Sequence, residues 1–135
     1  MGLPRFAPRY DTDLLRPYWV ALEKGEMQLP ACSECGAWQW YPMEVPRCHT
    51  HAHLIWKNVP TTGTVFACTT VQRCLLPDNK EAAPYVNALI ELDGVKGPRI
   101  VGLLVDFKEE PAAGTKVRLK KVKSGDLSLP AFGPA

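Results

Sequence analysis

The sequence has no long apolar run, little net charge and few histidines. No stretch approaches the roughly 18 apolar residues of a membrane-spanning helix, and the N-terminus has no apolar signal core, so we expect a cytoplasmic protein. The formal net charge of +2 gives little reason to expect a polyanionic partner. With 135 residues there is no room for a large enzyme scaffold, and one modest core is expected.

The cysteines, in contrast, are arranged in a pattern typical of a zinc site. Cys32 and Cys35 are separated by two residues, and Cys48 follows after twelve more. Zn²⁺ prefers four soft or borderline ligands in a tetrahedron, and a two-residue gap lets both side chains of one turn reach the ion. His51 repeats this gap after Cys48. The sequence therefore predicts a structural zinc ribbon with Cys32, Cys35, Cys48 and His51 as ligands.

The fourth ligand is the open part of this prediction. His49 and His53 also stand near the third cysteine, and spacing alone does not decide among the three histidines. We choose His51 because its gap matches that of the first pair. Three thiolates and one imidazole would leave no position for water, which favours a structural ion over a catalytic one. Cys68 and Cys74 remain, and they are predicted to be structural free thiols.

Residues 13–24 are predicted to form one amphipathic helix. Apolar side chains recur there at helical spacing, Asp13 is a candidate N-cap, and Gly25 stands where the helix should stop. Pro17 is comfortable only in the first turn of a helix, so the start is also compatible with a position near Arg16.

Residues 38–46, between the two cysteine pairs, hold two tryptophans, one tyrosine and two prolines. This is more apolar area than a solvated loop carries. We interpret the stretch as a ribbon hairpin, with one part in the core beneath the zinc site and another part as contact surface.

From Trp56 onward the pattern changes to β-strands separated by turn-forming residues. The four predicted strands are β-branched and alternating, and they span residues 64–71, 85–92, 99–107 and 116–122. A fifth, short strand is expected near Trp56 or at the C-terminus. Gly102 interrupts the third strand, as expected where a strand bends to close a barrel. A five-stranded OB-type barrel is the most economical closed arrangement.

The predicted fold class is thus mainly β, in three parts. An N-terminal arm and amphipathic helix occupy residues 1–29, a rubredoxin-like zinc ribbon residues 30–56, and a five-stranded OB-fold barrel residues 57–135. The run Lys116–Lys123 is the only basic run, and we interpret it as the solvated face of a strand.

Several short motifs follow one another in a specific order over nearly the whole chain. They are Arg16-Pro-Tyr-Trp19, Cys32-x-x-Cys35-Gly36, Tyr41-Pro42, Pro46-Arg-Cys48, Gly63-Thr-Val65, Pro84-Tyr-Val86 and Leu129-Pro130-Ala-Phe132. This order resembles the zinc-ribbon plus OB-fold proteins that accompany thiolase-superfamily acyl-CoA enzymes. The chain departs from the family at His51, where members usually have a fourth cysteine, and many members have lost zinc ligands altogether.

The resemblance implies a non-catalytic accessory subunit in a hetero-oligomer with a thiolase-like protein, which cleaves C–C bonds by thiolysis or retro-aldol chemistry on an acyl-CoA. Similar proteins accompany thiolases, retro-aldolases acting on steroid side chains, and the archaeal assembly of a thiolase with hydroxymethylglutaryl-CoA synthase. Another is the small subunit of the benzoylsuccinyl-CoA thiolase of anaerobic toluene breakdown. The Trp-rich stretch would suit an aromatic acyl group, which mildly favours the benzoylsuccinyl-CoA thiolase subunit among these relatives.

Catalysis by this chain alone is not expected. Claisen-type chemistry on a thioester needs a nucleophilic cysteine with a nearby base and an oxyanion hole, and neither Cys68 nor Cys74 has an evident orienting partner. We expect the partner to hold the catalytic groups, while this subunit stabilises the complex and covers part of the CoA site. Arg47, Lys57 and Arg73 are candidates for the CoA phosphates, although such residues are more often plain surface charge.

An independent single-stranded nucleic-acid-binding module is the alternative interpretation, because zinc ribbons and OB folds both bind oligonucleotides. The near-neutral charge balance and the small number of aromatic residues in the predicted barrel argue against it.

Overall fold

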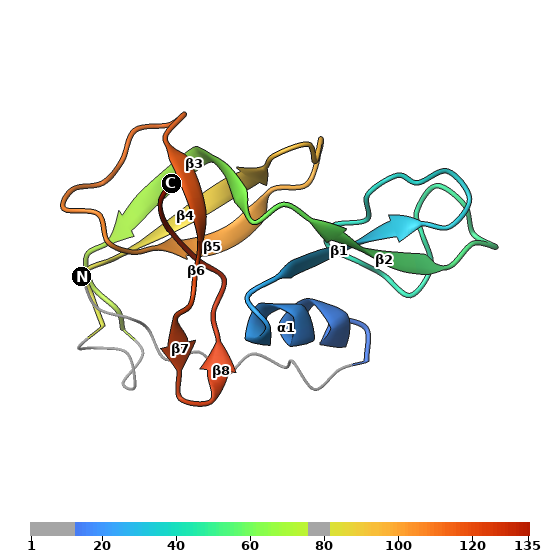
Figure 1. Cartoon of the computed structure of the whole chain (residues 1–135), viewed down its shortest axis with the longest axis horizontal. Coiled ribbons are helices and arrows are strands. Elements are labelled where there is room, and N and C mark those ends of the chain that lie inside the picture. Colours follow the sequence, from blue (N-terminus) through green and yellow to red (C-terminus); the bar gives the residue numbers. More distant parts are fainter. Residues whose placement is uncertain (1–12, 76–81) are drawn as a thin grey trace.

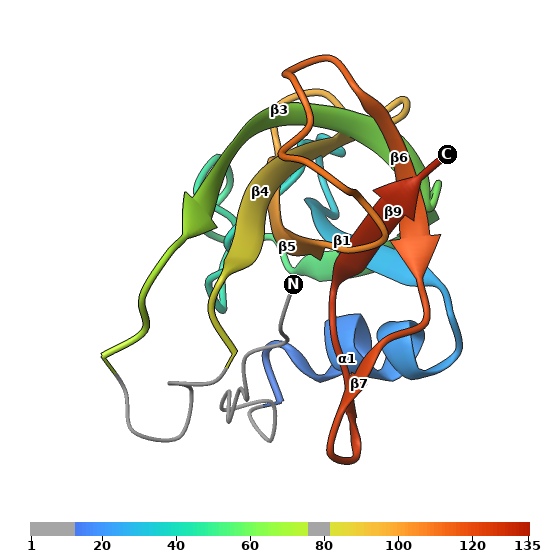
Figure 2. The same cartoon turned by 90° about the vertical axis from the view of Figure 1, so that its left-hand side faces the viewer.

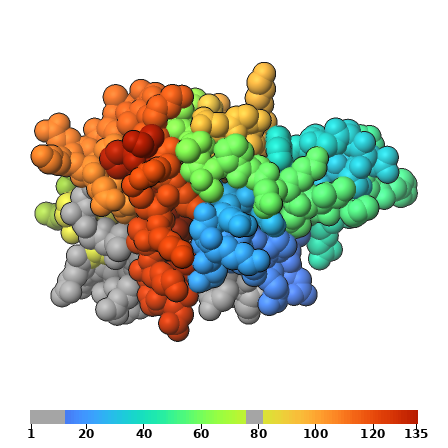
Figure 3. Space-filling model, in the orientation of Figure 1, coloured from blue at the N-terminus to red at the C-terminus, as the bar shows by residue number. Residues whose placement is uncertain are grey.

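The computed structural model describes residues 13–75 and 82–135, and its core is a closed β-barrel with a two-stranded ribbon beside it (Figure 1). The ribbon pairs β1 (Met27–Cys32) with β2 (Leu54–Val59) in antiparallel register. A helix of about two turns, α1 (Arg16–Glu23), lies against the junction of ribbon and barrel and contacts β1 (Figure 3). No helix in the described part of the chain is long and apolar enough to cross a bilayer.

The barrel closes through five strands in the order β3-β4-β5-β9-β6 (Figure 2). Their bounds are β3 (Thr62–Val71), β4 (Tyr85–Leu92), β5 (Ile100–Leu104), β6 (Lys116–Lys120) and β9 (Ala131–Pro134). Neighbours are antiparallel except β5 and β9, which pair in parallel. The predicted OB-type barrel is confirmed. Its fifth strand is the C-terminal one, because Trp56 lies in β2 and pairs with Pro30 of the ribbon.

Alternation of apolar and polar residues accounts for the strands. In β4 every second side chain from Val86 to Leu92 is buried in the barrel, while those between them are half-exposed. In β6 the exposed Lys116 and Arg118 flank the fully buried Val117, which confirms the solvated-face interpretation of the basic run. The strand ends at Lys120 and not at residue 122 as predicted.

Gly102 allows the closest approach in the barrel. A Cβ atom at this position would lie 2.8 Å from the carbonyl oxygen of Pro130 and 2.9 Å from the Cδ2 atom of Phe132. Pro130 precedes β9 and Phe132 lies within it, so glycine is required here because β9, the parallel partner of β5, brings these atoms against the backbone of Gly102. The sequence predicted a bend of the strand at Gly102, and the structure shows a close approach of neighbouring atoms at this residue.

The helix is shorter than predicted. It begins at Arg16 with Pro17 in its first turn, and residues 13–15 form a turn before it. The N-cap is Leu15, whose side chain makes no cap hydrogen bond, so the assignment of Asp13 as N-cap is wrong. Asp13 instead forms an ion pair of 2.9 Å with Arg16. Gly25, with φ of 74°, ends the helix as predicted.

Residues 38–46 do not form the predicted hairpin. Their pairing with the ribbon is a single isolated bridge between Ala31 and Trp38, and the rest of the stretch is irregular. Trp38 and Trp40 pack against the main core, whereas other apolar side chains of the same stretch are exposed. The expected division into a core part and a surface part is therefore present without the expected strands.

A short hairpin of β7 (Lys123–Ser124) and β8 (Leu127–Ser128) is bonded to the end of α1 through Glu23. The carboxylate of Glu23 accepts a 2.9 Å hydrogen bond from the backbone N–H of Ser128 and lies 3.6 Å from the Nζ atom of Lys123. The bond from the Ser128 N–H, with a smaller effect from the Lys123 charge, holds the pKa of Glu23 below its ordinary value of 4.5.

Glu23→Gln is expected to lower thermal stability at pH 7 and to have no effect at strongly acidic pH. A carboxyl group whose pKa is lowered by folding stabilises the folded state above its ordinary pKa of 4.5, and this contribution is lost as the pH falls through the folded-state value. Thermal melts of both proteins across pH 7 to 3 test this, with Glu44→Gln in an exposed loop as the control. An equal difference between wild type and Glu23→Gln at every pH would contradict the assignment.

Candidate metal centre

The first cysteine pair lies in a tight turn at the end of β1. The N–H of Gly36 donates to the carbonyl of Cys32 at 2.9 Å, and the N–H of Cys32 donates to the carbonyl of Ala37 at 2.9 Å. Gly36 has a φ of 75°, a left-handed conformation that glycine adopts without steric cost. The turn brings the side chain of Cys35 back toward that of Cys32.

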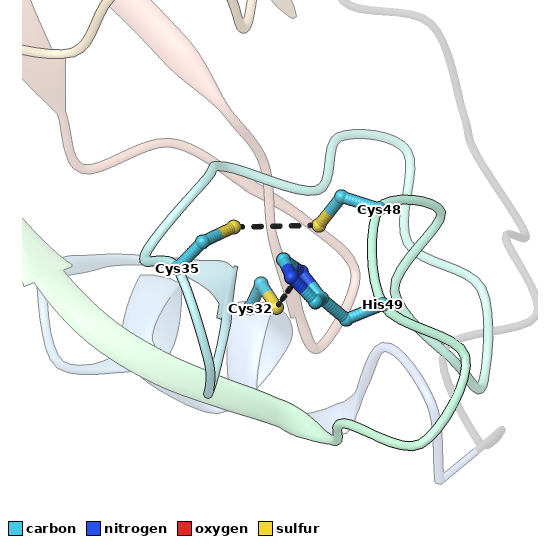
Figure 4. A group of neighbouring side chains, drawn as sticks. All are labelled: Cys32, Cys35, Cys48 and His49. Atoms are coloured by element: carbon cyan, nitrogen blue, oxygen red, sulfur yellow. Dashed lines mark hydrogen bonds between the residues drawn. The ribbon is translucent and has the colours of Figure 1, made fainter.

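Four side chains from the two ends of the ribbon loop converge on one point (Figure 4). The ligand atoms of Cys32, Cys35, Cys48 and His49 all lie within 4.8 Å of one another. The Sγ atoms of Cys35 and Cys48 are 3.5 Å apart, and the Sγ atom of Cys32 is 3.6 Å from Nδ1 of His49. Ligands in tetrahedral bonds to one zinc ion lie about 3.5 to 3.8 Å from each other, given the usual Zn–S and Zn–N lengths. The three thiols and one imidazole therefore fit zinc in donor type and number, and these two separations match those of a tetrahedral site.

The fourth member of this cluster is His49, whereas the sequence-based choice was His51. After Cys48 the chain turns, with the carbonyl of His49 accepting a 3.1 Å hydrogen bond from the N–H of Ala52. His53 is paired with Ser33 through two hydrogen bonds of 2.9 and 3.1 Å. After this turn the ring of His49, the residue next to Cys48, lies with the cysteines. The two-residue gap that favoured His51 therefore does not identify the histidine of the cluster.

The thiols of the cluster have unlike pKa values. Desolvation raises the pKa of Cys32, but hydrogen bonds from the backbone N–H groups of Cys35 and Glu34 outweigh it and lower the value to about 6. Desolvation and the neighbouring thiols raise the pKa of Cys48 to about 11. Three such close thiols resist being charged together, so uptake of a cation should release protons from the cluster.

Sequence reasoning missed Gln39, which contacts the cluster from within the ribbon. Its side chain is only 8% exposed, and its Nε2 atom lies 3.6 Å from the Sγ atom of Cys48. No spacing rule singles out a glutamine. The one available signal was a polar residue placed between two tryptophans in an otherwise apolar stretch.

The three candidates for CoA phosphates are not gathered into one site. Arg47 lies in the ribbon loop and Lys57 in β2, and both are exposed. Arg73 follows β3, which ends at the side of the barrel away from the ribbon (Figure 1). A single phosphate site that includes both Arg47 and Arg73 is therefore not supported by their placement.

The remaining cysteines are free thiols outside the cluster. Cys68 donates to the carbonyl oxygen of Pro111 at 3.3 Å, and its pKa is raised by burial and by the carboxylate of Glu110. A thiol that is held protonated is a poor nucleophile at neutral pH. Its environment agrees with the structural role that was predicted.

Comparisons with known proteins connect the barrel to a described family. Residues 56–121 match the family model described as the C-terminal OB-fold domain of ChsH2. No curated protein sequence matches the chain. Among solved structures, a chain of the Ltp2-ChsH2(DUF35) aldolase is similar over 95% of this chain and 98% of its own length, with a TM-score of 0.80 and 22% identity.

A second similar structure is a DUF35-family protein of unknown function from Sulfolobus solfataricus. It covers 94% of this chain and 89% of its own length, with a TM-score of 0.61 and 16% identity. At these identities the two structures show that the chain shares their fold, ribbon included, and nothing more specific.

Proposed function

We propose that this chain is a non-catalytic accessory subunit of a thiolase-superfamily acyl-CoA enzyme, which it stabilises and whose CoA site it helps to form. The observation that carries the proposal is the likeness, at a TM-score of 0.80, to a chain of an aldolase whose name joins ChsH2 to Ltp2. The match of residues 56–121 to the ChsH2 OB-fold family supports it. The step from shared fold to shared role is an analogy.

The chain's own residues agree with a non-catalytic role. Its three histidines all lie in the ribbon, where His49 belongs to the thiol cluster. Cys68 is held as a thiol and faces a carbonyl and a carboxylate, neither of which makes it a nucleophile. In the assembled complex, the partner would then supply the catalytic groups that act on the acyl-CoA.

A structural zinc ion held by Cys32, Cys35, Cys48 and His49 is part of the proposal. With four protein ligands the ion would have no free position, and its role would be to stabilise the loop between β1 and β2. We also propose the division into residues 1–29, 30–56 and 57–135 as functional units, although the paired strands of the ribbon extend to Met27 and Val59. A cytoplasmic location and an aromatic or steroid acyl group belong to the same proposal.

An exposed apolar group on the ribbon is suited to contact the partner. We define the ribbon surface as Tyr41, Met43 and Val45, whose residues are 56%, 55% and 43% exposed. The Tyr41 ring is 4.9 Å from that of Trp40, which is 5.0 Å from that of the buried Tyr18 on α1. Aromatic and methionine side chains are enriched in protein interfaces, and a rigidly supported aromatic loses little entropy on binding.

The double variant Tyr41→Ser/Met43→Ser is expected to lose most of its partner. The test is affinity purification of the tagged chain from its native cells, with mass spectrometry of what remains after a moderate-salt wash. Wild type should retain a thiolase-like protein in near-stoichiometric amount, and the variant should bind it at least about 30-fold more weakly, as for a residue pair at an interface centre.

Phe66→Ser is the matched control, because Phe66 is 43% exposed but lies on β3 of the barrel. Equal retention by the double variant would contradict the ribbon surface as the contact. Absence of any thiolase-like protein from the wild-type sample would overturn the accessory role itself.

The nucleic-acid interpretation finds little support on the barrel surface. Phe66 is an exposed aromatic of β3, but the guanidinium carbon of Arg99 lies 3.7 Å from its ring centroid and so covers one face. Arg99 is in turn paired with Glu91 at 3.1 Å, so its positive charge is partly neutralised. Recovery of nucleic acid that is released steeply as salt rises would favour this interpretation over the accessory role.

A further inference from the structure

The side chain of Gln39 is buried between the two ligand-bearing turns of the candidate metal centre, and it makes three hydrogen bonds to them. Its Nε2 atom donates to the carbonyl oxygen of Ala37 at 3.1 Å and to the Sγ atom of Cys48 at 3.6 Å. Its Oε1 atom accepts a 3.0 Å hydrogen bond from the N–H of Arg47. One amide thus makes three contacts while only 8% of the residue is exposed.

These contacts join the two ligand-bearing turns. Ala37 belongs to the first turn, because its carbonyl also accepts the N–H of Cys32. Arg47 and Cys48 begin the second turn. The backbone of Gln39 is fixed separately, by a 2.9 Å hydrogen bond from its N–H to the carbonyl of Pro30 in β1. The amide is therefore anchored to the ribbon strand and reaches the second turn from a fixed position.

We propose that Gln39 is a positioning residue for the metal centre, which holds Cys48 against Cys35 and donates an N–H···S hydrogen bond to the Cys48 sulfur. The inference rests on the zinc site proposed above. Three thiolates and one neutral imidazole carry more negative charge than one Zn²⁺ neutralises, so an N–H donor aimed at a sulfur stabilises the bound state. Cys32 has such a donor in the backbone N–H of Glu34 at 3.4 Å, and Gln39 supplies one for Cys48.

A purely structural role for this glutamine makes a different prediction. A buried amide that only ties two turns together would lower stability when removed, but it would leave the sulfur–metal bond itself unchanged. A donor to the sulfur also alters the electronic properties of that bond. Removal of an N–H···S hydrogen bond raises the energy of the sulfur lone pair, and a sulfur-to-metal charge-transfer band then moves to lower energy.

The experiment uses the full chain with Co²⁺ as a spectroscopic probe and with Zn²⁺ in competition against a chelator. Gln39→Met keeps the length of the side chain without a donor, and Gln39→Glu keeps its shape but only accepts. Both are expected to weaken zinc binding by about 10- to 100-fold, the usual effect of losing a residue that orients a metal ligand, and to shift the cobalt–thiolate band to lower energy. Gln28→Met is the control, since Gln28 donates to Asn58 at 3.0 Å on the ribbon strands and not to a cluster thiol.

Unchanged zinc affinity and an unmoved band in both Gln39 variants would overturn the inference, even if their melting temperatures fall. If one variant fails to fold, the other gives the band position. Should wild type itself show no cobalt–thiolate band, the metal site of the proposed function fails, and the inference fails with it. If wild type binds the metal and both Gln39 variants show the same affinity and band position, the role of Gln39 fails while the proposed metal site stands.

Discussion

Cys48→Ser is expected to unfold the loop of the ribbon and to leave the barrel folded. Cys48 contributes one of the four converging ligands, with its sulfur 3.5 Å from that of Cys35. Besides these ligands, the loop between β1 and β2 is held by one isolated bridge between Ala31 and Trp38, a few turn hydrogen bonds, the Gln39 amide and the packing of Trp38 and Trp40 on the core. Structural zinc supplies about 10–16 kcal/mol of apparent binding free energy in small zinc domains, so losing one ligand removes the main stabilisation of such a loop.

The barrel should persist. The side chains that β3, β4, β5, β6 and β9 turn inward form one core together with side chains of α1, β1 and β2, but none of the five barrel strands carries a ligand of the cluster. Hydrogen exchange followed by mass spectrometry is the measurement. Residues 30–56 should exchange much faster in the variant, while β4 and β6 keep the protection of the wild type.

Controls separate the metal centre from a general loss of cysteine. Cys74→Ser removes a free thiol outside the cluster and should change nothing. His49→Ala should reproduce the effect of Cys48→Ser, whereas His51→Ala should not, because His49 and not His51 belongs to the cluster. Chelation of wild type should give the same exchange pattern. Unchanged exchange of residues 30–56 after both chelation and Cys48→Ser would refute a structural metal.

The barrel could be predicted because each of its long strands carries its own signal. β4 matches the predicted residues 85–92 at both ends, since strict alternation of burial follows directly from the pleat. The fifth strand was ambiguous because β9 has four residues, one of them Gly133, which is too short for a periodic pattern. Its identity depends on pairing with β5 and β6, which only the closed barrel defines.

The candidate site was predictable in its donor types but not in its arrangement. The spacing of Cys32, Cys35 and Cys48 was sufficient to predict that these three side chains converge. The choice of histidine depended on the hydrogen bond from Ala52 to the carbonyl of His49, which turns the chain after the third cysteine. Composition likewise showed that residues 38–46 were too apolar for a solvated loop, but not that an irregular path rather than a hairpin would carry Trp40 to Tyr18.

Phe132→Ala is expected to lower the free energy of unfolding by about 3–5 kcal/mol, the usual cost of removing a buried aromatic ring. Phe132 is fully buried in β9, where it stands opposite Leu104 of β5 and Leu119 of β6. The strand therefore closes the barrel at this residue, and its ring fills the space that Gly102 leaves open. Since small domains have a free energy of unfolding of about 5–15 kcal/mol, this substitution would remove a large part of the total stability.

Urea unfolding of the barrel measures this loss, with Phe66→Ala as the matched control. Phe66 is 43% exposed and is stabilised by its contact with Arg99, so its truncation should cost no more than about 1 kcal/mol.

Gly102→Ala alone should destabilise the fold by about 1–3 kcal/mol, because the added methyl meets both the Phe132 ring and the Pro130 carbonyl. In the double variant the ring is gone and only the carbonyl contact remains, so the cost should be less than the sum of the two single effects. Strict additivity would show that the ring and the glycine do not share this space, and a loss for Phe132→Ala no larger than for Phe66→Ala would contradict the closing role of β9.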